Sequence, residues 1–111
     1  MTETGTLVVL VTTPSVEDGQ TIARTLVTER LAACVSVVPG IRSFFVWEGR
    51  TQDEAEALLV VKTRRERYEA LERRILELHP YSVPEILALS VEAGSATYLS
   101  WVGETVGTEG G

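Results

Sequence analysis

The chain has 111 residues, of which 44% are hydrophobic and 23% charged, values that are typical of one soluble globular domain. Sixteen acidic residues outnumber ten lysines and arginines, so the formal net charge at pH 7 is −6. Nucleic acids and anionic membranes bind basic surfaces, and we therefore expect no nucleic-acid and no membrane partner. The negative charge leaves a cationic partner possible, including a metal ion.

The cysteine content and the start of the chain indicate the compartment. Cys34 is the single cysteine and has no partner for an intrachain disulfide, so nothing in the sequence points to an oxidising compartment. The apolar run at residues 7–11 is too short for the hydrophobic part of a signal peptide or for a membrane span. We expect a cytoplasmic protein.

One domain is predicted at residues 6–106, between flexible ends at 1–5 and 107–111. It opens with TLVVLVTT, residues 6–13, an unbroken β-branched run that predicts a strand covered by its neighbours. Ser15 favours a helix start, because Asp18 follows three positions later. The predicted buried stripe of that helix is Ile22, Ala23, Leu26, Val27 and Leu31.

A long, bent hairpin is the simplest interpretation of residues 34–63. CVSVV at 34–38 is typical of a strand, Pro39-Gly40 interrupts it where a bulge fits, and extended sequence resumes through residue 47. A polar turn at 48–50 precedes the returning strand EALLVVKT, residues 56–63. The apolar residues 44–47 near the tip exceed what two helices can cover, which predicts association between copies of the chain.

The second half of the chain repeats the helix and strand alternation. Thr63 and Glu66 form a T-x-x-E pattern, which predicts that Thr63 caps a second helix, and Pro80 ends that helix near His79. A fourth strand is expected at 84–91 and a short third helix at 96–106. This order is typical of the α+β class: a ferredoxin-like βαββαβ antiparallel sheet with helices on one face, plus a C-terminal helix.

An ordered set of motifs resembles the CutA divalent-cation-tolerance family. The motifs are ERLAACV at 29–35, PG at 39–40, WEG at 47–49, KT at 62–63, HPYSVPEI at 79–86 and YLSW at 98–101. The resemblance covers about residues 6–106. It implies a homotrimer similar in architecture to the PII signalling proteins and linked to tolerance of divalent cations. It also implies Cu(II) or another divalent cation as ligand; we expect none to be required for folding.

His79 and Cys34 are the candidate metal ligands. Imidazole binds Cu(II) and Zn(II) well, but one histidine does not complete a site, and His79 has the alternative of bonding a free carbonyl near the helix end. For Cys34 the resemblance implies a link to copper, whereas its small apolar neighbours favour a buried thiol. Val11 and Leu78 occupy places where some family members have a further cysteine and a second histidine. Symmetry in a homotrimer would supply ligands that one chain lacks.

Lys62, Tyr81, Glu85 and Trp47 are the candidates for a cleft between subunits. A Lys–Glu pair beside a tyrosine hydroxyl suits an anion or another small molecule, as in a PII-like sensor or signalling adaptor. The alternative is a structural ion pair, with Tyr81 as a hydrogen-bonded anchor. Trp47 either stacks on a ligand or packs in a subunit interface.

Catalytic motifs are missing from the sequence. It contains no G-x-S-x-G elbow, no Walker loop and no G-x-G-x-x-G fingerprint. We therefore expect a protein that is not an enzyme. The leading hypothesis is a divalent metal tolerance or response protein, and the alternative is a small-molecule sensor or adaptor.

Overall fold

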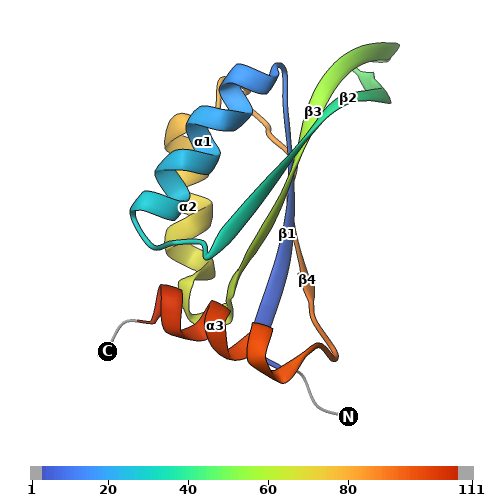
Figure 1. Cartoon of the computed structure of the whole chain (residues 1–111). Helices are drawn as coiled ribbons and strands as arrows, with labels where there is room; N and C mark the ends of the chain where they lie inside the picture. The colour runs from blue at the N-terminus through green and yellow to red at the C-terminus, as the bar shows by residue number, and fades with distance from the viewer. Residues whose placement is uncertain (1–3, 108–111) are drawn as a thin grey trace.

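The sheet is built around β1 (Thr6–Thr13), as its unbroken β-branched sequence predicts. In the computed structural model, which describes residues 4–107, the strand order is β2-β3-β1-β4 and every pair is antiparallel. The other strands are β2 (Cys34–Trp47), β3 (Arg50–Arg64) and β4 (Ile86–Ser90). β1 therefore has a neighbour on each side, while β2 and β4 form the edges (Figure 1).

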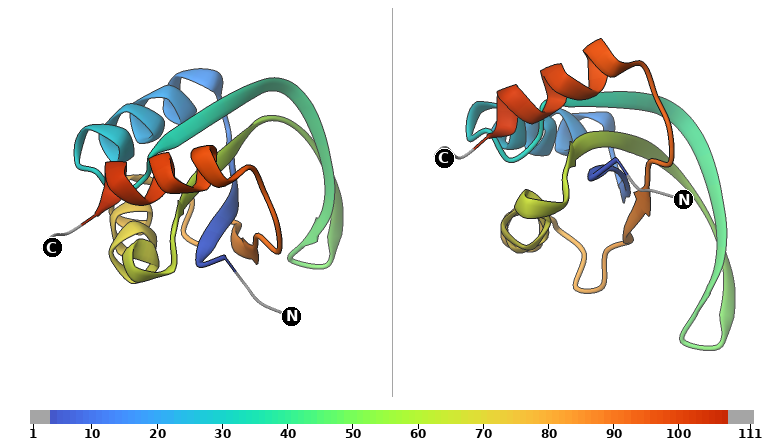
Figure 2. Two further views of the ribbon diagram at one scale, coloured as in Figure 1. Left: turned by 60° about the horizontal axis from the view of Figure 1, so that its bottom comes forward. Right: turned by 90° about the horizontal axis from the view of Figure 1, so that it is seen from below.

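Two of the three helices form a layer on one face of the sheet. α1 (Val16–Thr28) and α2 (Tyr68–Leu78) lie side by side there, and α3 (Ala96–Val106) crosses the end of the sheet where β1 begins (Figures 1 and 2). The predicted ferredoxin-like α+β arrangement with a C-terminal helix is confirmed. No helix among residues 4–107 is both long and apolar enough to cross a membrane.

The core lies between the sheet and the helix layer. Leu7, Val9 and Val11 point into it from β1, because alternate side chains of a strand share one face. They meet β3 and both helices. The remaining fully buried members of this cluster are Ile22, Leu26, Ala32, Leu59, Val61, Leu71 and Ile75.

The opposite face of the sheet is also apolar but lacks a helix layer. We call it the outer sheet face; it contains Val8, Leu10, Val38, Leu58, Val60, Leu87 and Leu89. Its β4 side is open to solvent, since Leu87 is 55% and Leu89 is 53% exposed. α3 contacts β3 and β1 at one end of the sheet. The fold thus leaves one side of its central strand without a cover.

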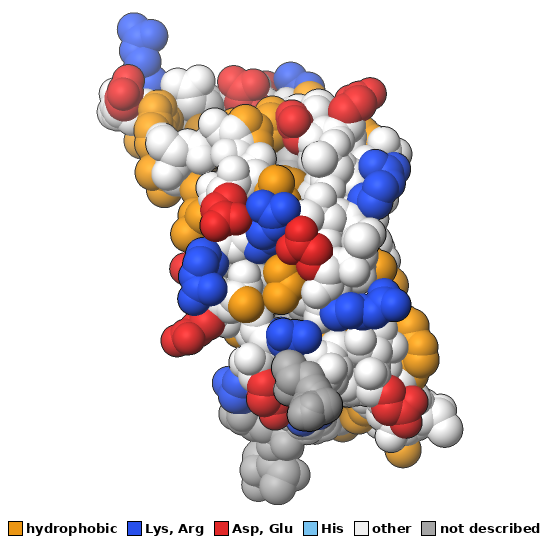
Figure 3. Space-filling model, turned by 90° about the vertical axis from the view of Figure 1, so that its left-hand side faces the viewer, with side chains coloured by type: hydrophobic (Ala, Val, Ile, Leu, Met, Phe, Trp, Pro, Cys, Tyr) orange, Lys and Arg blue, Asp and Glu red, His pale blue; other side chains and the backbone are white. Residues whose placement is uncertain are grey.

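The opposite surface, formed by the helix layer, is polar and carries charges of both signs. Figure 3 shows basic side chains interspersed with acidic ones over this surface. Arg74 on α2 joins Glu29 beyond the end of α1 to Glu77, with N–O distances of 3.0 Å to each. Such a mixed surface is typical of a solvated helix face and not of a nucleic-acid contact.

The predicted hairpin is present and bends away from the helix layer (Figures 1 and 2). Its pairing shifts between Val38 and Ile41, next to Gly40, whose φ of +72° places it in the left-handed region that glycine tolerates. The returning strand β3 begins at Arg50, earlier than residue 56. The pairing therefore continues to the tip.

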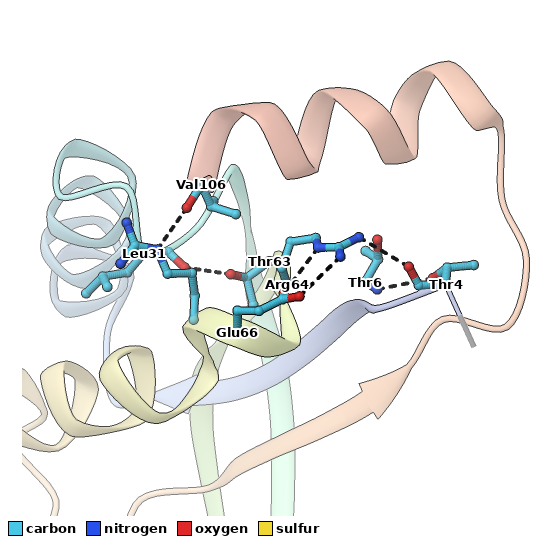
Figure 4. Close-up of polar contacts among 8 residues, drawn as sticks. Thr4, Thr6, Leu31, Thr63, Arg64, Glu66 and Val106 are labelled. Atoms are coloured by element: carbon cyan, nitrogen blue, oxygen red, sulfur yellow. Dashed lines mark hydrogen bonds and ion pairs between the residues drawn. The ribbon is translucent and has the colours of Figure 1, made fainter. Parts of the chain in front are cut away.

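The two predicted helix caps have different outcomes. Ser15 caps α1 as expected, accepting a hydrogen bond from the backbone N–H of Asp18. The cap at Thr63 is wrong, because Thr63 lies within β3 and donates its hydroxyl to the Leu31 carbonyl at 2.6 Å (Figure 4). α2 begins only at Tyr68, after a 3₁₀ turn (Arg65–Arg67). Thr63 is therefore part of strand β3, although the local sequence pattern had assigned it to the start of α2.

The ends of the ordered fold lie slightly outside the predicted boundaries. Thr4 donates its hydroxyl to the Val91 carbonyl at 2.7 Å, and Gly5 accepts a hydrogen bond from the backbone of Arg65. Arg64 also bonds the Thr4 carbonyl (Figure 4). Residues 4 and 5 are thus tied to the sheet and not free. The rest of the predicted flexible ends, 1–3 and 108–111, lies outside the described residues.

The stability of a Leu59 variant tests the placement of the core. Leu59→Ala removes a side chain with 0% exposure from the centre of the sheet, and we expect a loss of about 2–5 kcal/mol in the free energy of unfolding. Leu76→Ala is the control, because Leu76 is 50% exposed on α2. Guanidinium unfolding at one fixed protein concentration measures both. Equal losses for the two variants would contradict the placement of the core.

Candidate functional site

His79 ends α2 and is buried, with 7% of its surface exposed. Its Nε2 lies 2.7 Å from the carbonyl oxygen of Thr12, and its Nδ1 lies 3.1 Å from the backbone nitrogen of Tyr81. The carbonyl can only accept and the amide can only donate, so Nε2 carries the proton and Nδ1 accepts. Both ring nitrogens are thus engaged by backbone, and neither is free for a metal in this conformation.

The ring of His79 instead fastens the end of β1 to the segment that follows α2. The sequence analysis gave His79 the alternative of bonding a free carbonyl near the helix end. His79 does bond a carbonyl, but that carbonyl belongs to Thr12 on β1 and not to the end of the helix. The Tyr81 ring packs beside the imidazole, with 4.9 Å between ring centroids. His79 therefore positions Tyr81.

Tyr81 donates its hydroxyl to the Glu56 carboxylate at 2.7 Å. Glu56 comes from β3 and is 8% exposed. Burial of the phenol raises the pKa of Tyr81, and the adjacent Glu56 carboxylate raises it further, because ionisation would place two negative charges together. The contact spans 25 residues of sequence. Sequence reasoning missed Glu56; its one local signal is a carboxylate directly before the apolar run of β3.

A groove of about 770 Å³ lies between the hairpin tip and the segment 81–85. Trp47, Tyr81 and Glu85 all line it, so the structure brings together three of the four residues that the sequence proposed for a cleft. No lysine or arginine is among its lining residues. We call it the acidic aromatic groove; its lining is Thr12, Pro14, Ser43, Phe44, Phe45, Trp47, Gln52, Glu54, Glu56, Tyr81, Ser82, Val83 and Glu85.

Lys62 does not join this group within one chain. It pairs with Val8 on β1, and its Nζ donates to the Ser36 hydroxyl at 3.0 Å and to the Val60 carbonyl at 3.3 Å. Glu85 lies beside the other end of β1, about four residues or roughly 13 Å farther along the strand. The two residues share a sheet, as expected, but its antiparallel register separates them.

Cys34 begins β2 and is half-buried, more open than its apolar neighbours suggest. It pairs with Lys62, which pairs with Val8, so its side chain belongs to the outer sheet face. Burial raises the pKa of Tyr98 on α3, and the nearby Cys34 thiol adds to the rise. Cys34 and His79 thus contact opposite ends of the sheet. Among residues 4–107, no three His, Cys, Asp or Glu side chains are grouped so that they could hold a metal ion.

The chain matches a family model described as CutA1 divalent ion tolerance protein over residues 7–105. A relative from Thermus thermophilus named divalent-cation tolerance protein CutA is 49% identical over 100 residues, which cover 90% of this chain and 97% of the relative. The chloroplastic protein CutA of Arabidopsis thaliana is 46% identical over 96 residues, which cover 86% of this chain and 53% of that protein. The chain thus spans about half the length of this plant relative.

Solved structures show the same likeness. The divalent cation tolerance protein (Cut A1) from Thermus thermophilus superposes with a TM-score of 0.90 at 48% identity, covering 92% of this chain and 99% of that one. A periplasmic divalent cation tolerance protein CutA from Archaeoglobus fulgidus superposes with a TM-score of 0.89 at 37% identity, covering 92% and 99%. The names of these relatives place them in different compartments.

Alkaline titration tests the Tyr81–Glu56 contact. Glu56→Gln removes the negative charge but keeps an acceptor oxygen, so we expect Tyr81 to ionise at a lower pH than in the wild type. Tyrosinate absorbance follows the titration, Tyr81→Phe identifies the transition, and Glu104→Gln, an exposed change on α3, is the control.

The folded protein holds the Tyr81 proton more tightly than the unfolded chain. This contribution to stability is therefore complete below about pH 10 and is lost as the pH rises above it. Identical curves for Glu56→Gln and the wild type would contradict the contact.

Proposed function

Because the chain belongs to the CutA1 divalent ion tolerance protein family, we propose that it acts as a homotrimer that binds Cu(II) or another divalent cation. Family membership supports the link to divalent-cation tolerance. The uncovered outer sheet face is the observation that carries the assembly, and the position of Cys34 on that face supports a metal site completed by symmetry.

The assembly follows from two exposed apolar regions. On the outer sheet face, Leu87 and Leu89 are each more than half exposed, and at the hairpin tip Phe44 and Val46 are each 69% exposed. A monomeric soluble protein rarely leaves such regions open, because water contact with apolar surface is unfavourable. Packing the outer faces of several copies against one another covers them, and closed symmetric rings are the usual outcome.

The metal site that we propose lies where copies meet. A transition-metal site needs several ligands, and the described part of one chain does not group three. Cys34 is half-buried on the outer sheet face, so symmetry brings equivalent thiols toward a shared interface. His79 is the weaker ligand of the two candidates, since both of its nitrogens bond backbone groups. It reaches a metal only if those bonds break.

The second candidate function is a PII-like small-molecule sensor or signalling adaptor. The acidic aromatic groove favours it, because its volume of about 770 Å³ lies in the range of small-molecule sites. Trp47, Tyr81 and Glu85 are its candidate binding residues. Lys62 enters this cleft only if a neighbouring copy supplies it. An enzymatic role has less support, since Cys34 and His79, the conceivable thiol and base, contact opposite ends of the sheet.

The assembly is tested with a charge on the outer sheet face. We expect light scattering after size exclusion to give the mass of a trimer for the wild type and a lower mass for Leu89→Glu, because the new carboxylate would be buried between copies. Leu76→Glu places the same charge on the exposed side of α2 and should leave the mass unchanged. A wild-type monomer, or an unchanged trimer in Leu89→Glu, would contradict the interface.

Copper titration tests the metal site. We expect Cys34→Ser to weaken Cu(II) binding by about tenfold or more, because the thiolate is the softer ligand, and His79→Gln to weaken it less. Calorimetry with Cu(II) measures both variants, and circular dichroism checks that each is folded. Ser36→Ala, a nearby change on the same sheet face that keeps the thiol, is the control. Undiminished binding by Cys34→Ser would remove Cys34 from the site.

A further inference from the structure

We propose that the acidic aromatic groove binds a small organic cation with an ammonium group. The inference rests on the second candidate function and deepens it, since it names an organic ligand class for the same groove, a site separate from Cys34. It rests on the lining of the groove in one chain and does not depend on copper binding.

The first argument is charge. Glu54, Glu56 and Glu85 line the groove, and no lysine or arginine lines it. Glu56 is 8% exposed, and the one hydrogen bond of its side chain within residues 4–107 comes from a neutral hydroxyl, that of Tyr81. A buried carboxylate without a positive partner is costly, because it has lost water and gained no counter-charge. A bound ammonium group would supply that charge.

The second argument is the aromatic lining. Phe45, Trp47 and Tyr81 line the same groove as the carboxylates and come from two separate segments, the hairpin and the segment after α2. Aromatic faces attract organic cations through the quadrupole of the ring, and carboxylates near such rings add a direct charge interaction. In one chain Trp47 is 47% and Phe45 is 39% exposed, so both rings offer surface to a ligand where a neighbouring copy does not cover the hairpin. This pairing of rings and carboxylates selects an ammonium over a neutral molecule.

The same lining argues against other occupants. An anion would meet three carboxylates, and Lys62, the cation that an anionic ligand needs, lies about four residues farther along the sheet. A bare metal ion needs closely grouped ligands, and the described residues contain no group of three suited to one. A volume of about 770 Å³ is also far larger than one metal ion requires.

The experiment compares choline with 3,3-dimethyl-1-butanol, which has the same shape but no charge. The chain has two tryptophans, so the indole N–H signals of Trp47 and Trp101 give an internal comparison in proton–nitrogen NMR spectra. Trp101→Phe assigns the two signals. We expect choline to shift the Trp47 signal and leave Trp101 on α3 unmoved, with the neutral analogue binding at least about fivefold more weakly.

Two variants test the residues. Glu56→Gln should weaken choline binding at least about fivefold, and Glu104→Gln, which removes the same charge outside the groove, should leave it unchanged. The inference is overturned if the neutral analogue binds as well as choline, because the groove is then only apolar. It is also overturned if choline never shifts the Trp47 signal, as when a neighbouring copy fills the groove. Light scattering and copper titration of Glu56→Gln keep this outcome distinct from a failure of the proposed function.

Discussion

The central strand β1 has two apolar faces, and the helices cover one of them. This constraint comes from the sequence of Thr6–Thr13, where residues 7–11 are all leucine or valine and therefore place apolar side chains on both faces of the sheet. Leu7, Val9 and Val11 meet α1 and α2, whereas Val8 and Leu10 lie on the outer sheet face. We propose that other copies of the chain supply the layer that covers this second face. The exposed leucines of β4 and the long hairpin extend the same requirement to the edges of the sheet.

The chain of contacts from His79 to Glu56 fixes the other end of the sheet. Thr12 on β1 bonds His79, His79 positions Tyr81, and Tyr81 bonds Glu56 on β3. These hydrogen bonds hold the irregular segment after α2 against strands β1 and β3. The one histidine of the chain thus helps to shape a groove, and the Glu56 carboxylate that lines this groove accepts its side-chain hydrogen bond from the neutral hydroxyl of Tyr81.

Local signals in the sequence predicted the elements well. The β1 run, the Ser15 cap, the break at Pro39-Gly40 and the α3 range of Ala96–Val106 all appear where the pattern placed them. Thr63 was assigned wrongly, because a capping pattern does not reveal that the residue is already held in a strand. Trp47, Tyr81 and Glu85, proposed together from the sequence, line one groove, whereas Glu56 was not singled out and Lys62 lies outside that groove within one chain. Both depend on strand register, which joins residues far apart in sequence and leaves no local signature.

The hairpin belongs both to the groove and to the proposed contact between copies, because Phe44, Phe45 and Trp47 line the groove and are exposed in one chain. The central claim is that the outer sheet face is covered by other copies of the chain. Small-angle X-ray scattering of the wild type tests this most directly, since it reports mass and size together. The account predicts three times the 12.1 kDa chain mass and a radius of gyration well above the 14.7 Å of one copy. A particle of single-chain mass, with a radius near 14.7 Å, would contradict it.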